Sequence, residues 1–271
     1  MTKNVTDHAC AFRRMHQHGL LTLPNAWDAG SARLIEMMGA PAIATTSGGV
    51  AWSHGYADGV DLPLPRLLAS VEAICRAVQV PVTVDLENGY AHEPAAVGRN
   101  VAAVIDKGAV GINLEDGSDS PDRLCAKIMQ ARRAAVNCGI DVFINARTDV
   151  ILRGLAHGDE AIDEIVARAA RYRDAGADGL FVPGLVEPEA IARVVAEVAL
   201  PLNLLARPGL PDTDGLKKLG VRRLSAGSTL LECLYGQLAT MARSFIDRGC
   251  LPQPSNGFDY ARLNELFQQA A

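Results

Sequence analysis

Short apolar segments recur along the chain, and each is followed by a longer stretch in which apolar residues return at helical spacing. Residues 160–175 show that spacing, with apolar side chains at positions 161, 162, 165, 166 and 169, which is the pattern of a helix with one buried face. The short runs predict eight strands: Leu20–Leu23, Ala42–Thr45, Val82–Asp85, Gly111–Leu114, Val142–Asn145, Gly179–Val182, Leu202–Leu205 and Arg222–Ser225. A strand followed by a helix, repeated eight times, predicts an α/β fold of the (β/α)8 TIM-barrel type.

Glycine and proline mark the places where helices give way to strands. Glycine tolerates the left-handed backbone conformation that closes a helix, and proline ends one helix and opens the next strand. The residues in these positions are Gly39, Gly108, Gly139, Gly176, Gly220, Pro81 and Pro201. An open doubly wound sheet would carry a glycine-rich turn after its first strand, but residues 24–28 read Pro-Asn-Ala-Trp-Asp. The closed barrel is therefore favoured.

The chain length of 271 residues suits one such barrel, which takes about 250 residues. We expect a single domain over residues 1–271, with the barrel at about 20–248. The pattern of residues 258–271 predicts one more amphipathic helix beyond the eight units. Because its apolar face needs a surface to pack on, this helix predicts either a barrel plug or a contact between subunits.

Composition narrows the setting of the protein. Apolar residues make up 49% of the chain but aromatic residues only 5%, which suits a parallel sheet wrapped in helices. The net charge of -5 comes with no long basic run, so neither nucleic acid nor a membrane is an expected partner. Residues 1–23 contain no apolar signal-peptide core, and the six cysteines show no CxxC spacing. We expect a cytoplasmic protein with reduced, partly buried thiols.

Acidic residues gather at the ends of two adjacent predicted strands. Asp85 and Glu87 follow the third strand, and Glu115 follows the fourth. Chemistry in these barrels lies at the carboxyl ends of the strands, and three carboxylates brought together repel one another unless a cation separates them. With no His or Cys in these segments, the all-oxygen set favours Mg²⁺, with Mn²⁺ as an alternative, over Zn²⁺. The competing interpretation is that these acids cap helices or pair with outer arginines.

Further polar residues of the predicted rim suit an anionic substrate. The backbone N–H groups of Ser47, Gly48 and Gly49 could hold a carboxylate, although the same residues also suit a tight turn with a serine N-cap. Arg147 suits a carboxylate or phosphonyl group, unless it only pairs with Asp149. Two more candidate substrate contacts are Trp27, which follows the first strand, and Asn203, which lies in the seventh.

A metal, an amide cradle and an arginine together predict a site for a small 2-oxo acid that chelates metal through its carboxylate and carbonyl. Polarisation by the metal would stabilise an enolate-like oxyanion when the adjacent bond breaks.

Six short phrases, in this order and spacing, resemble the isocitrate lyase / phosphoenolpyruvate mutase superfamily over roughly residues 20–250. They are Leu23-Pro24-Asn25-Ala26-Trp27-Asp28 with Ser31-Ala32-Arg33, Thr46-Ser47-Gly48-Gly49, Gly55-Tyr56-Ala57-Asp58, Asp85-Leu86-Glu87-Asn88-Gly89-Tyr90, Asn113-Leu114-Glu115-Asp116 and Ala146-Arg147-Thr148-Asp149. Each phrase is weak alone, and their combination is specific.

The resemblance implies roles for these residues. It implies Mg²⁺ near Asp85, Glu87 and Glu115, partly through water, and a substrate carboxylate on the backbone of residues 47–49. It implies that Asp58 shapes or gates the site from a mobile loop, with Arg147 at the anionic end of the substrate, so that Asp58, Glu115 and Arg147 are the candidate catalytic residues. It also implies a homotetramer or homodimer that exchanges a C-terminal helix between subunits.

Two departures bear on the reaction. Isocitrate and 2-methylisocitrate lyases carry a Lys-Lys/Arg-Cys-Gly-His run after the fourth-strand acids, but residues 117–127 lack it, and Cys125 is predicted as a core residue of the next helix. The Lys-Asn-Ser loop of phosphoenolpyruvate mutase is missing too. In addition, Glu87 and Asn88 stand where the superfamily more often has Asp and Thr.

We therefore expect a short-loop member of the phosphonomutase or carboxyvinyl-carboxyphosphonate phosphorylmutase type, acting on a 2-oxo acid or a phosphonate. The alternatives are an oxaloacetate decarboxylase-like or 2-methylisocitrate lyase-like enzyme, or a catalytically lapsed barrel that binds a 2-oxo acid. A further alternative is a phosphate cup at Gly227-Ser228, which is equally a plain helix start.

Overall fold

A computed structural model describes residues 2–59, 62–251 and 258–268. In chain order, its elements are α1 Thr2–Met15, β1 Leu21–Leu23, β2 Asn25–Ala26, α2 Ala29–Met37, β3 Ile43–Thr45, α3 Ser47–Ser53, α4 Leu64–Ala77, β4 Val82–Asp85, α5 Pro94–Asp106, β5 Gly111–Glu115, α6 Pro121–Cys138, β6 Phe143–Arg147, α7 Gly158–Ala175, β7 Gly179–Phe181, α8 Pro188–Glu197, β8 Leu202–Leu205, α9 Thr213–Lys218, β9 Arg223–Ser225, α10 Thr229–Arg248 and α11 Tyr260–Gln268.

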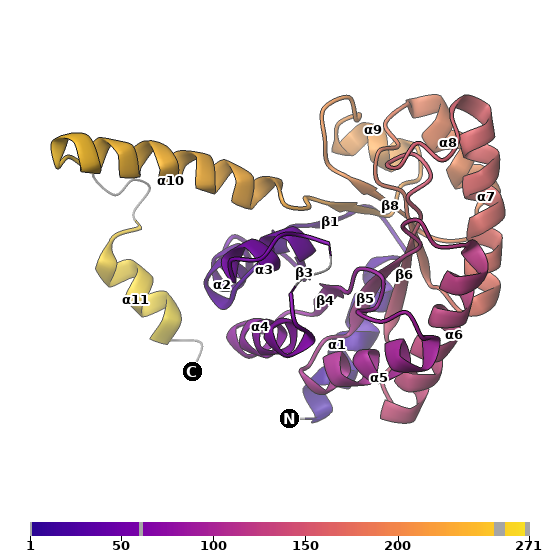
Figure 1. The fold of residues 1–271 in the computed structure, drawn as a ribbon, viewed down its shortest axis with the longest axis horizontal. Coiled ribbons are helices and arrows are strands. Elements are labelled where there is room, and N and C mark those ends of the chain that lie inside the picture. Colours follow the sequence, from indigo (N-terminus) through magenta and orange to yellow (C-terminus); the bar gives the residue numbers. More distant parts are fainter. Residues whose placement is uncertain (1, 60–61, 252–257, 269–271) are drawn as a thin grey trace.

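All strand pairs are parallel, in the order β1-β9-β8-β7-β6-β5-β4-β3-β2. The two ends of this series, β1 and β2, are consecutive in sequence and separated only by Pro24. Together they make one strand that pairs with β9 before the proline and with β3 after it. Helices cover the outside of the sheet (Figure 1). The predicted (β/α)8 barrel is confirmed, with each predicted strand within two residues of the observed one.

Asn25 closes the barrel at the point where Pro24 interrupts the first strand. Its side-chain Nδ2 donates to the Thr45 carbonyl at 2.7 Å, and its Oδ1 accepts from the amides of Ala226 and Gly227, both at 2.9 Å. The side chain thus joins the strand on one side to the segment after β9 on the other. A buried amide can replace ladder hydrogen bonds in this way because it both donates and accepts.

The N-terminal end of the barrel is closed by α1, a helix that the apolar pattern did not predict. Phe12 is fully buried, and the His16 ring stacks on Phe143 at 3.9 Å. Arg13 ties the helix to the barrel through Asp178 at 2.8 Å and Asp141 at 2.6 Å. A side chain on Gly111 would come within 2.8 Å of the Phe12 ring. It would also come within 2.7 Å of Thr83 Oγ1 in β4, so the plug and the neighbouring strand together require glycine at this position.

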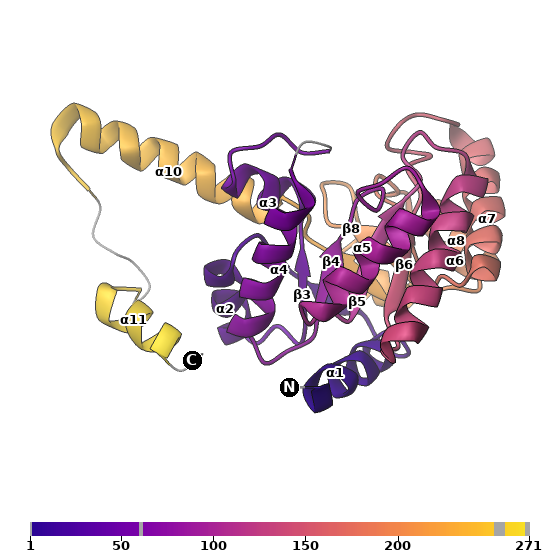
Figure 2. The same ribbon diagram turned by 60° about the horizontal axis from the view of Figure 1, so that its bottom comes forward.

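The C-terminal helices leave the barrel. In Figures 1 and 2, α10 projects away from it, and α11 lies on the same side, near α2. Leu266 of α11 is buried, and its carbonyl accepts from Arg33 of α2 at 3.3 Å. The predicted tail helix is confirmed over Tyr260–Gln268, and its last three positions lie outside the described residues. As a barrel plug the prediction was wrong, because α11 packs outside the barrel, on α2.

Two expectations from composition can be compared with the structure. None of the helices in the described ranges has the length and apolarity to cross a membrane. The cysteines are free, but Cys10, Cys138, Cys233 and Cys250 are exposed, so partial burial holds only for Cys75 and Cys125. Cys125 lies in α6 and packs against the main core, as predicted.

Candidate active site

The C-terminal ends of β4, β5 and β6 bring the main candidate residues to one side of the barrel mouth. Asp85 is the last residue of β4, Glu115 of β5 and Arg147 of β6. The parallel register pairs Asp85 with Asn113 and Glu115 with Arg147. Because neighbouring strands end at similar heights, the three side chains start from adjacent positions on the rim.

Arg147 is held between two carboxylates. Its Nη1 lies 2.8 Å from Glu115 Oε2, while its Nε and Nη2 donate to Asp149 at 2.6 and 3.1 Å. The pairing with Asp149 that the sequence left open is therefore present. A guanidinium has five N–H donors, so these contacts leave others for an anionic ligand. The neighbouring carboxylates raise the pKa of Arg147 despite its burial, and the side chain remains a cation.

Asp116 fixes the segment that carries Arg147 and Asp149. Its backbone N–H donates to the Arg147 carbonyl at 3.2 Å, and its Oδ1 accepts from the Asp149 amide at 2.9 Å. Its other oxygen, Oδ2, accepts from Arg168 at 2.8 Å and from the Tyr172 hydroxyl at 2.6 Å. This buried carboxylate is thus fully engaged and joins the rim to α7. The sequence places Asp116 in the motif Asn113-Leu114-Glu115-Asp116 but does not indicate this role.

Asp85 faces the start of α3. Its Oδ2 accepts from the Ser47 amide at 3.4 Å, and its own amide donates to Thr45 Oγ1 at 2.9 Å. Its second oxygen, Oδ1, is buried and has no hydrogen-bond partner among the described residues. A buried carboxylate oxygen without a donor is costly, and a bound cation would satisfy it.

Residues 47–49 begin a helix rather than a tight turn. Thr46 takes the N-cap position of α3 and its side chain makes no cap hydrogen bond, so the serine N-cap interpretation was wrong. Glycine at position 48 lets Asp58 approach, because an added Cβ would lie 3.3 Å from Asp58 Oδ2. At position 49, an added Cβ would lie 2.6 Å from the Thr46 side chain and 3.0 Å from Trp27. Both glycines therefore allow close packing at the rim.

Burial makes the carboxylates of the mouth hard to ionise together. It raises the pKa of Glu87 to about 7, against a hydrogen bond from Tyr90, and the charge of Asp85 raises it further. It raises the pKa of Glu115 to about 8, against the opposing charge of Arg147. Burial also raises the pKa of Asp58, against a hydrogen bond from Ser47. The charge of Asp85 adds to the effect of burial on all three pKa values.

These residues suit a divalent cation with an incomplete protein shell. Within the described ranges, no group of three His, Cys, Asp or Glu side chains is gathered closely enough to enclose a metal ion. Mg²⁺ commonly takes only one or two carboxylates and completes its octahedron with water and substrate. The unpartnered Asp85 Oδ1 and the acidic surroundings fit that mode of binding.

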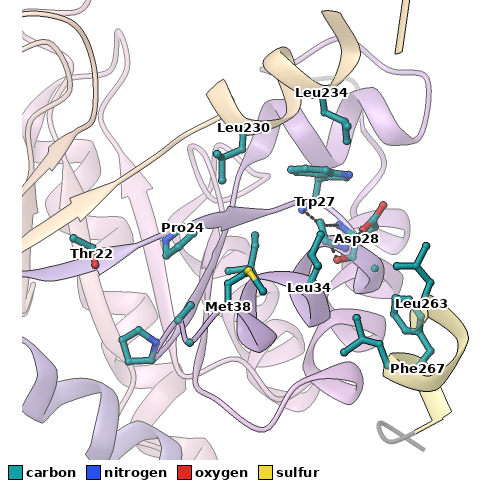
Figure 3. Close-up of a pocket in the computed structure, with 17 residues that line it drawn as sticks. Thr22, Pro24, Trp27, Asp28, Leu34, Met38, Leu230, Leu234, Leu263 and Phe267 are labelled. Atoms are coloured by element: carbon teal, nitrogen blue, oxygen red, sulfur yellow. Dashed lines mark hydrogen bonds between the residues drawn. The ribbon is translucent and has the colours of Figure 1, made fainter. Parts of the chain in front are cut away.

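Trp27 lies beside Gly49 of α3, whereas Asn203 lies in β8. Asn203 is buried in β8, where its Oδ1 accepts from Ser225 at 3.3 Å and its Nδ2 has no partner among the described residues. Trp27 lines a groove of about 810 Å³ between α2, α10 and α11. Figure 3 shows its ring beside Leu234 of α10, among apolar side chains.

The phosphate cup considered at the eighth strand is not supported. The amides of Ala226 and Gly227 already donate to Asn25 Oδ1, both at 2.9 Å. The Ser228 hydroxyl donates to Glu232 at 2.6 Å. With these donors occupied, the segment is better described as the plain start of α10.

Comparison with known proteins decides the family. The model of the phosphoenolpyruvate phosphomutase family matches residues 12–246. The chain belongs to this family. The resemblance drawn from the strand-end phrases is thereby confirmed.

Relatives of the chain cover most of its length. A proposed phosphonomutase from Burkholderia cenocepacia, a solved structure, is 40% identical with a TM-score of 0.84, over 88% of this chain and 99% of that one. An uncharacterised Mycobacterium tuberculosis protein is 37% identical, over 90% of this chain and 92% of the relative. A proposed 2-methylisocitrate lyase of Corynebacterium glutamicum is 30% identical, over 80% and 73%. Oxaloacetate decarboxylases and 2,3-dimethylmalate lyase are also among the family relatives.

Proposed function

We propose that this protein is a Mg²⁺-dependent lyase or mutase that breaks or rearranges a C–C or P–C bond next to the carbonyl of a small 2-oxo acid. The observation that carries the proposal is the buried Oδ1 of Asp85, which has no hydrogen-bond partner among the described residues and lies at a barrel mouth with further acids. Besides burial, the charge of Asp85 raises the pKa of Asp58, Glu87 and Glu115 there, and the charge of Arg147 lowers it. A divalent cation would satisfy the unpartnered oxygen and reduce the repulsion between the acids.

Asp85, Glu87 and Glu115 would hold the ion, directly or through water. When bound, the ion polarises the carbonyl oxygen of a 2-oxo acid and stabilises negative charge on it. Asp85 is best placed for direct contact because its Oδ1 is unpartnered among the described residues. Glu115 has a second task, since it also fixes Nη1 of Arg147 at 2.8 Å.

Arg147 and α3 would position the substrate. The remaining N–H groups of Arg147 would contact the anionic end, while the backbone at Ser47–Gly49 would receive the carboxylate. Asp58 would close over this position, since its Oδ2 lies beside Gly48. Burial raises the pKa of Asp58, against a hydrogen bond from Ser47, and its carboxyl group would lie close to the bound substrate.

The names of the relatives support both kinds of bond chemistry. The proposed phosphonomutase favours P–C chemistry, and the 2-methylisocitrate lyase and oxaloacetate decarboxylase relatives favour C–C chemistry. The segment between β5 and α6, residues 116–120, is short. It lacks the Cys-Gly-His run of the lyases that act on tricarboxylates. We therefore favour a phosphonomutase-like reaction or cleavage of a smaller 2-oxo acid.

A substrate panel tests the proposal. Phosphonopyruvate, oxaloacetate, 2-methylisocitrate and 2,3-dimethylmalate would be incubated with the full chain in Mg²⁺ or EDTA, and the products followed by NMR. We expect metal-dependent turnover of one of them. Turnover unaffected by EDTA would overturn the metal assignment. Binding of these acids with no product from any of them would favour the catalytically lapsed alternative.

The exposed C-terminal helices support the proposed oligomer. Leu234, Leu238, Phe245 and Ile246 on α10 are 46%, 52%, 53% and 74% exposed, and such a row of apolar side chains marks a protein contact. We propose a homodimer or homotetramer that covers this face. Light scattering should give a multiple of the chain mass, and the double variant L238D/F245D should shift it toward the monomer.

A further inference from the structure

The turn that follows β4 is strained at the residues next to the candidate metal site. Glu87 and Tyr90 have φ values of 48° and 54°, in the left-handed region that residues other than glycine rarely adopt. Such strain persists only where surrounding contacts impose it, and it concentrates at functional sites. The backbone conformation of Glu87 sets the direction in which its carboxylate leaves the chain.

The carbonyls of residues 87–90 in this turn each accept from a donor elsewhere in the chain. The Glu115 amide donates to the Glu87 carbonyl at 3.0 Å. Asn100 of α5 donates to the carbonyls of Gly89 and Tyr90 at 2.9 and 3.4 Å. The remaining carbonyl, that of Asn88, accepts from Lys127 Nζ at 2.8 Å.

Lys127 stands out because its ammonium group is buried. The residue lies in α6 and is only 1% exposed. Its nearest carboxylate is Asp119 at 3.4 Å, which is itself about one-third exposed. Burying an ammonium group is costly unless its contacts repay the loss of water. Here it makes one carbonyl bond and one longer ion pair, both to loops at the barrel mouth.

Those two loops carry the acidic residues of the site. Asn88 follows Glu87 directly, and Asp119 is tied by its amide to the Asp116 carbonyl at 2.7 Å, next to Glu115. Lys127 thus joins the turn after β4 to the loop after β5, without itself being part of the acidic cluster.

We propose that Lys127 is a positioning residue that holds Glu87 in its left-handed conformation and so aims the Glu87 carboxylate at the metal site. The inference rests on the proposed metal site and assigns a residue that supports it. Without the bond to Asn88, the turn would relax toward an ordinary backbone conformation and swing Glu87 away. A lysine with a purely structural role would stabilise the loop without affecting Glu87 in particular.

A double-mutant cycle separates these two roles. Mg²⁺ affinity would be measured by calorimetry on the full chain for wild type, K127M, E87Q and K127M/E87Q. We expect K127M to weaken binding by about tenfold, as is typical for a residue that orients a metal ligand. In the E87Q background the same change should have no further effect. Equal weakening in both backgrounds, or none in either, would overturn the proposal.

Hydrogen exchange gives a readout that does not need the metal. Exchange of the Gly89 amide, which donates to Leu86 at 2.7 Å, should accelerate in metal-free K127M. K127Q, which can still donate to Asn88, should restore part of the protection. The control K107M removes a lysine that pairs with Glu72 at 3.2 Å and should leave exchange and Mg²⁺ affinity unchanged. If wild type binds no Mg²⁺, the proposed function fails. Exchange then decides the role of Lys127 in the turn, and unaltered exchange in K127M would overturn it.

Discussion

The two ends of the barrel differ in how their charged side chains are paired. At the N-terminal end, Asp178 is paired with both Arg13 and Arg132, and the aromatic rings of Phe12 and Phe143 fill the opening. At the C-terminal end, several carboxylates share Arg147, and burial raises the pKa of Glu87 to about 7 and that of Glu115 to about 8. The first end is closed by contacts within the chain, whereas the second is the proposed site of the metal ion and the substrate. This is the division between stability and chemistry expected of the two faces of such a barrel.

Arg223 connects the two ends. It is fully buried in β9, and its Nη2 donates to Asn113 at 3.4 Å. Burial lowers the pKa of Arg223 to about 9, against the charge of Asp85 at the mouth, and Arg223 in turn lowers the pKa of His16 at the opposite end. A change in charge at one end of the barrel should therefore shift the pKa of Arg223 and, through it, the pKa of groups at the other end.

The largest effect is expected at the mouth. Asp85→Ala should lower turnover by roughly 10³-fold or more, because a bound metal supplies several kcal/mol of transition-state stabilisation. Steady-state kinetics with the substrate identified by the panel measures this. The melting temperature of the metal-free variant should stay at or above that of wild type, since one repelling charge is gone. Retention of a tenth of the activity would contradict the role of Asp85.

The counterpart at the closed end is Phe12→Ala. Removing this buried ring should cost about 3–5 kcal/mol of unfolding free energy, measured by urea titration. At temperatures where the variant stays folded, kcat should remain close to that of wild type. A large loss of kcat in the folded variant would show that the N-terminal end contributes to catalysis as well as to stability.

A smaller loss is expected for Arg147→Lys. Lysine keeps the charge but cannot bridge Glu115 and Asp149 and also contact a ligand. The value of kcat/KM should fall about 10²-fold, corresponding to one or two lost charged hydrogen bonds. The lysine variant matching wild type would mean that charge alone matters at this position.

The N-terminal end should make the protein sensitive to acid. Burial, reinforced by Arg223, lowers the pKa of His16 to about 3, below the value of about 6.5 in an unfolded chain. The contribution of neutral His16 to the free energy of unfolding is present above pH 6.5. It is lost as the pH falls toward 3, because His16 is protonated at a higher pH in the unfolded chain than in the folded protein. The slope should approach about 1.4 kcal/mol per pH unit. In urea titrations from pH 6.5 to 4.5, the free energy of unfolding of H16F should depend less on pH than that of wild type. An unchanged slope in H16F would rule out His16 as the source of the acid sensitivity.

The mouth should show the opposite pH dependence. Burial raises the pKa of Glu87 to about 7 and that of Glu115 to about 8, so these groups favour folding below their unfolded pKa. Metal-free protein should lose that contribution as the pH rises from about 4.5 to 8, with a limit of about 1.4 kcal/mol per pH unit for each group, a limit that solvent screening lowers. The increase in melting temperature on adding Mg²⁺ should be larger at pH 8 than at pH 6, and the reverse order would contradict this assignment.

The strands and their order could be predicted because apolar runs and glycine or proline boundaries record burial directly. The candidate acids followed from their position at strand ends. The plug formed by α1 was missed, although Val5, Ala9 and Phe12 recur at helical spacing and pack in one cluster. A helix that precedes the first strand has no fixed place in the strand–helix repeat, so the spacing alone does not show that it closes the barrel. Lys127 was also missed, because a lysine in an amphipathic stretch is normally read as solvent-exposed, and its carbonyl partner at Asn88 is defined only by the fold.

Calorimetric titration with Mg²⁺ at pH 7.5, in the presence of oxalate as a small chelating dianion, tests the central claim most directly. Wild type should bind one Mg²⁺ per chain, and D85N should bind at least about 100-fold more weakly, since a direct ligand is removed. Equal binding by wild type and D85N, or no binding by wild type, would contradict a metal site at the barrel mouth.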